Sequence, residues 1–158
     1  MECKHHIHAE NTPSNLAFFP LNPKKSMIPF RKAHMKREYD LEKRLTTYSC
    51  KMINIVEQLP STKAGKYIAG QLIRSGNSPA FNYGEAQSAE SRRDFVHKLK
   101  VVLKELKECR IALTIIKEKN MLDDANILNE QLKETEELIA IIAKSIDTAE
   151  KNIEKGLD

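Results

Sequence analysis

The chain has 158 residues, of which 41% are hydrophobic and 30% are charged, a composition typical of one globular domain and not of a disordered chain. No apolar run approaches the roughly 18 residues of a membrane-spanning helix, so we expect no membrane partner. The formal net charge is +4 but uneven: residues 60–110 carry ten basic and five acidic side chains, whereas residues 111–158 carry six and eleven.

Residues 1–34 differ from the rest of the chain. They contain four of the six prolines and show no helical period. The sequence therefore predicts a disordered or irregular N-terminal extension over 1–34 and a folded domain over 35–158, or, alternatively, a natural start at Met35. A metal could bind near the N-terminus, although an untethered terminus with incidental metal affinity is the preferred interpretation. The residues concerned are Cys3, His5, His6 and His8.

The first predicted helix follows Asp40, a suitable cap, and stops at Pro60. Its apolar residues recur at steps of four and three, which places them on one stripe that faces a partner. They are Leu41, Leu45, Tyr48, Met52, Ile55 and Leu59. Ser61 or Thr62 is expected to cap the second helix, which begins near Lys63.

The second helix has small residues where the first has bulky ones, which would let a neighbouring backbone come close. Its stripe is Ala69, Leu72, Gly76, Pro79, Tyr83 and Ala86. Pro79 removes a backbone hydrogen bond, so a kink or local break is expected between Gly76 and Pro79. The side chains of Ser75, Asn77 and Ser78 could satisfy the freed backbone groups.

The third helix either starts at Ser91, with Asp94 completing a capping pair, or continues from Asn82. Its apolar stripe is Phe95, Leu99, Val102, Leu106, Cys109, Leu113 and Ile116. The opposite face carries a basic stripe, defined as Arg93, Lys100, Lys104 and Lys107. Asn120 is expected to end the helix.

The fourth helix is predicted to start at Asp123 or Asp124. Its stripe is Leu128, Leu132, Thr135, Ile139, Ile142, Ile146, Ala149 and Ile153. Four helices with short connections and one narrow apolar stripe each predict an all-α, antiparallel up-down-up-down four-helix bundle.

Cysteine and histidine usage indicates no catalytic centre. Three cysteines without a secretion signal favour a reducing cytoplasm, and Cys50 and Cys109 lie on or beside apolar stripes, so both are interpreted as small core residues. His97 has no Ser or Cys nucleophile nearby in sequence. The acidic cluster Glu134, Glu136 and Glu137 lacks the Glu-x-x-His spacing of di-iron bundles. We therefore expect no enzyme activity, no catalytic residue, no metal site in the bundle and no cofactor.

The segment AGKYIAGQLIRSGNSPAFNYGEAQSAESRRDFVHKLKVVLKEL contains motifs of the form IAxQLxRSxxS, NYxEAxxAxSxxDFxxKL and LKEL. From Asp40 to about Asn152 the chain resembles the bacterial four-helix bundle proteins whose founding members are encoded in intervening sequences of large-subunit ribosomal RNA genes. It is also similar to the accessory variability protein of diversity-generating retroelements. The resemblance implies a homo-oligomer, in particular a pentameric ring, with RNA, DNA, a reverse transcriptase or another protein as candidate partners.

Several polar residues match the family's motif: Arg74, Ser75, Ser78, Asn82, Tyr83, Glu85, Arg92, Arg93, Asp94 and Lys98. A structural interpretation makes Ser75, Ser78, Asn82, Glu85 and Arg110 one buried polar network, with Arg74 or Arg110 paired with Glu85. A functional interpretation places an anion or nucleic-acid site at Arg74 and Arg92. For this motif the structural interpretation is preferred, because polar groups near bundle cores most often fix helix register.

The basic stripe also has two interpretations, a nucleic-acid surface or a solvated charged face. The predicted nucleic-acid-binding residues are Arg74, Arg92, Arg93, Lys98, Lys100, Lys104 and Lys107. The sequence thus predicts a cytoplasmic, non-enzymatic, homo-oligomeric adaptor that binds RNA or DNA through a basic surface repeated by symmetry. The alternative is a protein-binding or structural assembly module, in which the basic stripe pairs with the acidic fourth helix of a neighbouring copy.

Overall fold

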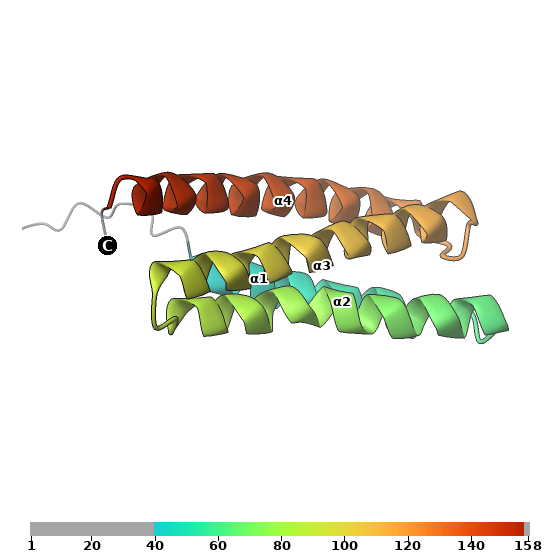
Figure 1. Ribbon diagram of the computed structural model, residues 1–158. Helices are drawn as coiled ribbons and strands as arrows, with labels where there is room; N and C mark the ends of the chain where they lie inside the picture. Colours follow the sequence, from blue (N-terminus) through green and yellow to red (C-terminus); the bar gives the residue numbers. More distant parts are fainter. Residues whose placement is uncertain (1–39, 157–158) are drawn as a thin grey trace, which may run out of the picture. The chain divides into compact units, whose positions relative to one another are not determined.

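The computed structural model describes residues 40–156, which form four α-helices (Figure 1). The helices are α1 (Leu41–Glu57), α2 (Lys63–Gln87), α3 (Arg92–Glu118) and α4 (Ala125–Glu154). The predicted extension over 1–34, the alternative start at Met35 and the N-terminal Cys and His residues all lie outside the described residues.

Each helix begins at a side chain that accepts a hydrogen bond from a free backbone N–H group of the first turn. Asp40 accepts from Lys43 N at 2.9 Å, Thr62 from Gly65 N at 3.0 Å, Ser91 from Asp94 N at 3.2 Å and Asp124 from Asn126 N at 2.9 Å. The cap predicted at Asp40 is confirmed. Of the alternative caps, the structure has Thr62 and not Ser61 before α2, and Asp124 and not Asp123 before α4. Because Ser91 caps α3, this helix does not continue from Asn82.

Neighbouring helices run antiparallel, as the pairing of their residues shows. Between α2 and α3, Ser75 contacts Cys109 and Glu85 contacts Lys98. Between α3 and α4, Lys100 pairs with Glu150 and Arg110 with Glu136. In both cases residue numbers rise along one helix as they fall along the next. The predicted up-down-up-down bundle is confirmed.

The small residues of α2 bring it close to α1. A Cβ atom placed on Gly76 would lie 2.7 Å from Met52 Cβ, and Ser49 Oγ donates a hydrogen bond to the Gly76 carbonyl at 3.0 Å. The predicted local break does not occur, because α2 is one helix through Pro79. Pro79 is buried, so packing holds the helix together across the turn that loses a hydrogen bond.

Most of the core comes from the predicted apolar stripes, but in α4 Leu138 is fully buried whereas Ile139 of the predicted stripe is half-buried. The largest fully buried side chains of the core include Tyr48, Met52, Leu72, Leu99, Leu106, Leu113, Ile116, Leu138 and Ile142. Cys109 is buried as expected, but the prediction for Cys50 is wrong, since its side chain is exposed. Cys50 follows Ser49 in α1 and therefore lies one position off the buried stripe.

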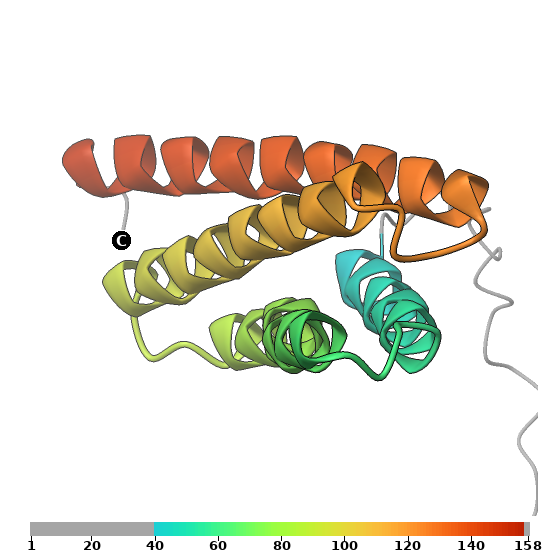
Figure 2. The same cartoon turned by 90° about the vertical axis from the view of Figure 1, so that its right-hand side faces the viewer.

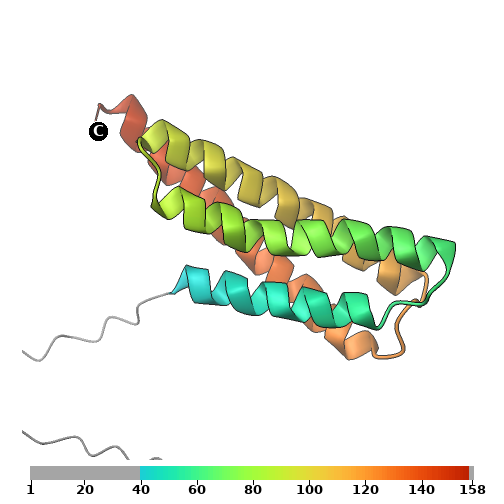
Figure 3. The same cartoon turned by 90° about the horizontal axis from the view of Figure 1, so that it is seen from below.

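The seam between α1 and α4 is the least closely packed of the four contacts between neighbouring helices. In Figure 2, α1 and α2 are seen nearly end-on, whereas α4 runs across the view, so α4 is inclined to α1. Figure 3 shows the same inclination from below, with α4 crossing behind the other helices. Because the two axes diverge, long side chains make the contacts across this seam.

Candidate functional site

Two separate pairs of buried polar contacts lie in the bundle, one between α2 and α3 and one between α1 and α4. Ser75 Oγ in α2 donates to the Gln71 carbonyl at 3.0 Å and accepts from Cys109 Sγ in α3 at 3.4 Å. On the other side of the core, the Tyr48 hydroxyl of α1 lies 2.9 Å from Thr135 Oγ1 of α4. Thr135 donates its single hydroxyl proton to the Gln131 carbonyl at 2.6 Å, so Tyr48 is the donor to Thr135.

Burial governs the titration of this layer. It raises the pKa of the Tyr48 hydroxyl far above its usual range. It also raises the pKa of the Cys109 thiol to about 11, against the opposing effect of the hydrogen bond with Ser75. Both groups are therefore neutral at physiological pH, which makes Cys109 a poor nucleophile. The layer is structural, not catalytic.

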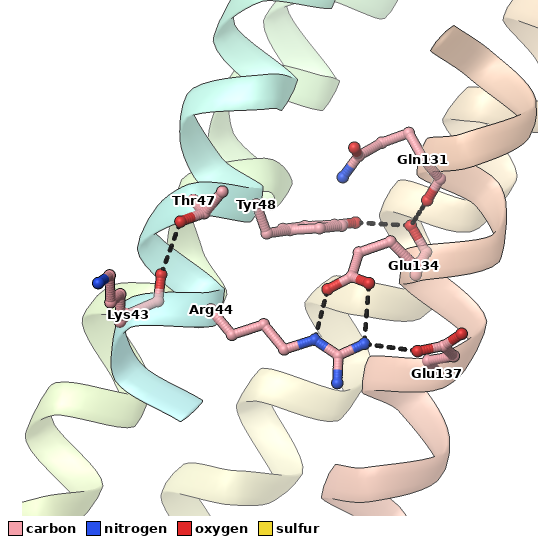
Figure 4. A network of polar contacts seen from close by, with 8 residues as sticks. Lys43, Arg44, Thr47, Tyr48, Gln131, Glu134 and Glu137 are labelled. Atoms are coloured by element: carbon pink, nitrogen blue, oxygen red, sulfur yellow. Dashed lines mark hydrogen bonds and ion pairs between the residues drawn. The ribbon is translucent and has the colours of Figure 1, made fainter. Parts of the chain in front are cut away.

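Next to this layer, Arg44 closes the α1–α4 seam (Figure 4). Its guanidinium binds Glu134 through Nε at 2.6 Å and Nη2 at 2.8 Å, and Nη2 also lies 2.7 Å from Glu137 Oε2. Hydrogen bonding to Glu134 raises the pKa of Arg44 further above its already high value. This bidentate pair fixes the register of α4 against α1.

A cleft follows Tyr48 along the same seam and has a volume of about 370 Å³. We call it the Gln131 cleft. It is lined by Lys51, Asn54, Glu57 and Gln58 of α1 and by Ile127, Glu130 and Gln131 of α4. The side chain of Gln131 extends from α4 toward α1 (Figure 4). Gln131 is 1% exposed, and its Nε2 atom has no hydrogen-bond partner among the described residues.

The predicted polar network of the family motif does not form as one unit. Ser75 is buried, but Ser78 and Asn82 are half-buried and bond only within α2, where Asn82 Nδ2 donates to the Ser78 carbonyl at 2.9 Å. Glu85 pairs with Lys98 at 2.6 Å, which raises the pKa of Lys98. The predicted pairing of Glu85 with Arg74 or Arg110 is therefore wrong.

The two arginines bind elsewhere. Arg110 pairs with Glu136 of α4 at 3.2 Å, and Arg74 donates to the Gln71 side chain within α2 at 2.6 Å. The reason is geometric: Arg110 faces α4 and Arg74 is on the exposed face of α2, so neither reaches the α2–α3 seam where Glu85 meets Lys98.

The predicted basic surface divides into paired and unpaired cations. Lys98, Lys100 and Lys104 form ion pairs with Glu85, Glu150 and Glu108, the last two at 2.7 and 3.5 Å. Arg92, Arg93 and Lys107 are exposed and have no hydrogen-bonded or ion-paired partner for their side chains within residues 40–156. Arg74 lies on α2, apart from this stripe.

Arg92 lines a groove of about 460 Å³ between the start of α3 and the second half of α4. The other lining residues are Phe95, Lys144, Ser145, Thr148, Ala149 and Asn152. Lys144 is paired with Asp147 at 3.2 Å, so Arg92 is the lining cation without an acidic partner in the described part of the chain. Lys151 and Lys144 together lower the pKa of Asp147.

Other chemistry-bearing residues remain apart. Across residues 40–156, no three His, Cys, Asp or Glu side chains gather where they could hold a metal ion. None of the four helices that the structure describes is long and apolar enough to span a bilayer. His97 is exposed, and Glu134 and Glu137 serve as partners of Arg44.

The sequence reasoning did not identify the polar groups of the α1–α4 seam. One signal was present: Tyr48 and Thr135 are hydroxyl residues at core positions of two helices, and buried hydroxyls need partners. Gln131 precedes Thr135 by four residues, on the same face of α4, so its burial could also have been expected.

Solved structures support the fold. A crystal structure of a protein with unknown function from the S23 ribosomal protein family of Bacteroides thetaiotaomicron matches with a TM-score of 0.62 and 23% identity. The match covers 67% of this chain and 97% of that chain. The comparison with curated proteins gave no match.

The family model described as 23S rRNA-intervening sequence protein matches residues 37–144, more than half of the 158 residues. This range contains the three motifs on which the resemblance rests and the first three helices with most of the fourth. The chain therefore belongs to the 23S rRNA-intervening sequence protein family.

Proposed function

We propose that this protein is a non-enzymatic, homo-oligomeric adaptor that binds RNA or DNA through the basic residues of α3. The observation that carries the proposal is the group of unpaired cations Arg92, Arg93 and Lys107, which have no acidic partner within residues 40–156. Their guanidinium and ammonium groups are free to contact phosphates, whereas Lys98, Lys100 and Lys104 would first have to leave a carboxylate.

The groove beside Arg92 supports this assignment. It presents Ser145, Thr148 and Asn152, whose hydroxyl and amide groups commonly contact phosphate and sugar oxygens. One chain offers few unpaired cations, so a useful affinity requires that several copies present them together. The proposal therefore includes self-association, and a pentameric ring is the form that the family resemblance favours.

Exposed apolar side chains support self-association. Tyr67 and Phe81 of α2 are 66% and 71% exposed, and Ile111 of α3 is 58% exposed. Large exposed apolar side chains are candidates for burial in a contact with another copy of the chain. The same observation favours a second candidate function, a protein assembly module that has no nucleic-acid ligand.

The test compares two charge-reversal variants of the full chain. In the first, Arg92, Arg93 and Lys107 are changed to Glu. In the second, the control, Lys117, Lys119 and Lys133 are changed to Glu, because these exposed lysines give the same change in net charge away from the proposed surface. Each protein is titrated with a structured RNA and a duplex DNA over a salt series, and light scattering gives its mass.

We expect binding by the wild type that weakens steeply with salt, loss of binding in the first variant and near-normal binding in the control. The oligomer should survive in both variants. No binding at low salt, or equal losses in the two variants, would contradict the nucleic-acid proposal. Dissociation of the first variant into single chains would instead indicate that these cations hold neighbouring copies together, as an assembly module requires.

A further inference from the structure

The α1–α4 seam differs from the other seams of the bundle in how it is held. It is the least closely packed of the four, because the axes of α1 and α4 diverge (Figure 2). Two clefts lie along it: the Gln131 cleft beside the second half of α1, and a cleft of about 310 Å³ beside the first half, lined by Lys43 and Thr47 of α1 and Glu134 of α4 among others. Van der Waals contact therefore contributes less to this seam than to its neighbours.

Polar side chains hold the seam instead (Figure 4). Arg44 of α1 binds Glu134 at 2.6 Å and Glu137 at 2.7 Å, and the Tyr48 hydroxyl lies 2.9 Å from Thr135 Oγ1. We call the side chains of Arg44, Glu134 and Glu137 the latch. The side chains of Arg44 and Glu134 are 22% and 26% exposed, so water reaches them. An ion pair that water reaches gives way more readily than close-packed apolar contacts, because both charges are solvated when it opens.

Gln131 favours separation of the two helices at the same seam. Its side chain is enclosed at 1% exposure, and Nε2 is the one buried side-chain nitrogen or oxygen in residues 40–156 that has no hydrogen-bond partner. When α1 moves away from α4, water reaches the amide and this donor gains a partner. At the α2–α3 seam, by contrast, the buried Ser75 and Cys109 are already paired, so opening there gives no such gain.

We propose that the bundle opens at the α1–α4 seam while its other three seams stay closed, and that the latch controls this opening. In the open form α1 stays packed on α2 and α4 on α3, the four helices remain folded, and the buried layer of Tyr48, Gln131 and Thr135 meets water. Exposure of the core face beside this layer keeps the open form a minor one. The inference does not rest on nucleic-acid binding, because the cations of α3 take no part in the latch.

Thiol labelling measures this opening at single positions. The reporter protein is the full chain with Cys3→Ser and Cys50→Ser, which remove the other thiols, and with Thr135→Cys on the seam. The native Cys109 thiol, fully buried between α2 and α3, serves as the internal reference. The protein is incubated with excess N-ethylmaleimide under native conditions, and mass spectrometry of its peptides gives the labelling rate at each position. Global unfolding exposes both thiols, whereas opening of the seam exposes position 135 alone.

We expect position 135 to be labelled at least about tenfold faster than Cys109, because the seam opens more often than the whole chain unfolds. A second reporter protein carries Leu138→Cys in place of Thr135→Cys. Leu138 is fully buried on the same helix, and its replacement keeps the hydrogen bond between Tyr48 and Thr135. This reporter should show the same preference over Cys109, which checks that Thr135→Cys does not itself loosen the seam.

Two matched arginine variants test the latch. Arg44→Met breaks the ion pairs across the α1–α4 seam and should speed labelling at position 135 by about fivefold. Arg110→Met, the control, removes the pair with Glu136 across the α3–α4 seam and should leave that rate unchanged, since this seam stays closed. Gln131→Leu should slow the labelling by at least about fivefold, because the closed seam then holds no unpartnered amide.

Each outcome decides the question. Labelling no faster than that of Cys109 in either one of the two reporter proteins would overturn the proposal, because the seam would then open only when the whole chain unfolds. Equal acceleration by Arg44→Met and Arg110→Met, or none by Arg44→Met, would overturn the role of the latch. The charge-reversal variant of Arg92, Arg93 and Lys107 should keep the labelling rate at position 135, so failure of nucleic-acid binding and failure of seam opening are distinguishable.

Discussion

Replacing Gly76 with alanine should destabilise the bundle, because α1 lies directly against this position. The new Cβ would lie 2.7 Å from Met52 Cβ and 2.9 Å from Met52 Cγ. Met52 Cβ is attached to the α1 backbone, so no rotation of the side chain relieves the first contact and the two helices must separate. Overpacking of a core costs about 1–3 kcal/mol, and the higher helix propensity of alanine offsets about 1 kcal/mol of this. We expect a net loss of about 0–2 kcal/mol in the free energy of unfolding, against a gain in a glycine without close neighbours.

Gly70→Ala is the matched control. It lies in the same helix, but no atom outside its own helical surroundings lies within 4 Å of the added Cβ. It should therefore stabilise the protein by about 0.5–1 kcal/mol through helix propensity alone. Urea denaturation of the full-length wild type and both variants, followed by circular dichroism, measures the difference.

A further variant tests the cause. In Gly76→Ala combined with Met52→Ala, the Cγ atom 2.9 Å from the new methyl group is removed and only Cβ remains, so the loss should be smaller than the sum of the two single losses. A Gly76→Ala variant that gains as much stability as the Gly70→Ala control would refute the close packing of α1 on α2 at this level.

Three further predictions concern the polar layer. Thr135→Val leaves the Tyr48 hydroxyl buried without a partner and should lower the free energy of unfolding by about 1–3 kcal/mol. The double variant Thr135→Val with Tyr48→Phe should lose less than the sum of the two single losses, which urea denaturation measures. Arg44→Met removes the bidentate pair with Glu134, whose side chain is only about a quarter exposed, and should lower the free energy of unfolding by about 1 kcal/mol. In 1 M NaCl the difference in stability between this variant and the wild type should be smaller, because salt screens the attraction between the two charges. The folded state holds the Cys109 proton more tightly than the unfolded chain, because the thiol has a pKa of about 11 in the fold against 9.0 outside it. The free energy of unfolding should therefore decline by about 2–3 kcal/mol as pH rises from about 9 to about 11. Cys109→Ala should show a shallower decline in the same pH series.

Periodicity and capping were local enough to be recognised without the fold. The apolar steps of four and three identified the buried face of every helix, because a helix that packs on one side must repeat its contacts every turn. The N-terminal caps also follow from residue type, since each has a side-chain oxygen that accepts a hydrogen bond from a first-turn N–H group. These caps are Asp40, Thr62, Ser91 and Asp124. Cys50 was wrongly predicted to be buried, because periodicity does not separate a buried position from the exposed one next to it. It follows the buried Ser49 and is exposed.

What the sequence by itself determined is the all-α bundle, its four helices and the family, because these follow from patterns within one helix or one motif. The structure decided between Ser91 and Asn82 for the start of α3. The tertiary structure decided which charges meet. Glu85 binds Lys98 and not an arginine, and Arg44 reaches 90 residues along the chain to Glu134. Such pairings depend on how two helices are rotated and inclined, and α4 is inclined to α1. Long polar side chains respond to that geometry, whereas apolar stripes only require burial, so the Gln131 cleft could be recognised only after the helices were assembled.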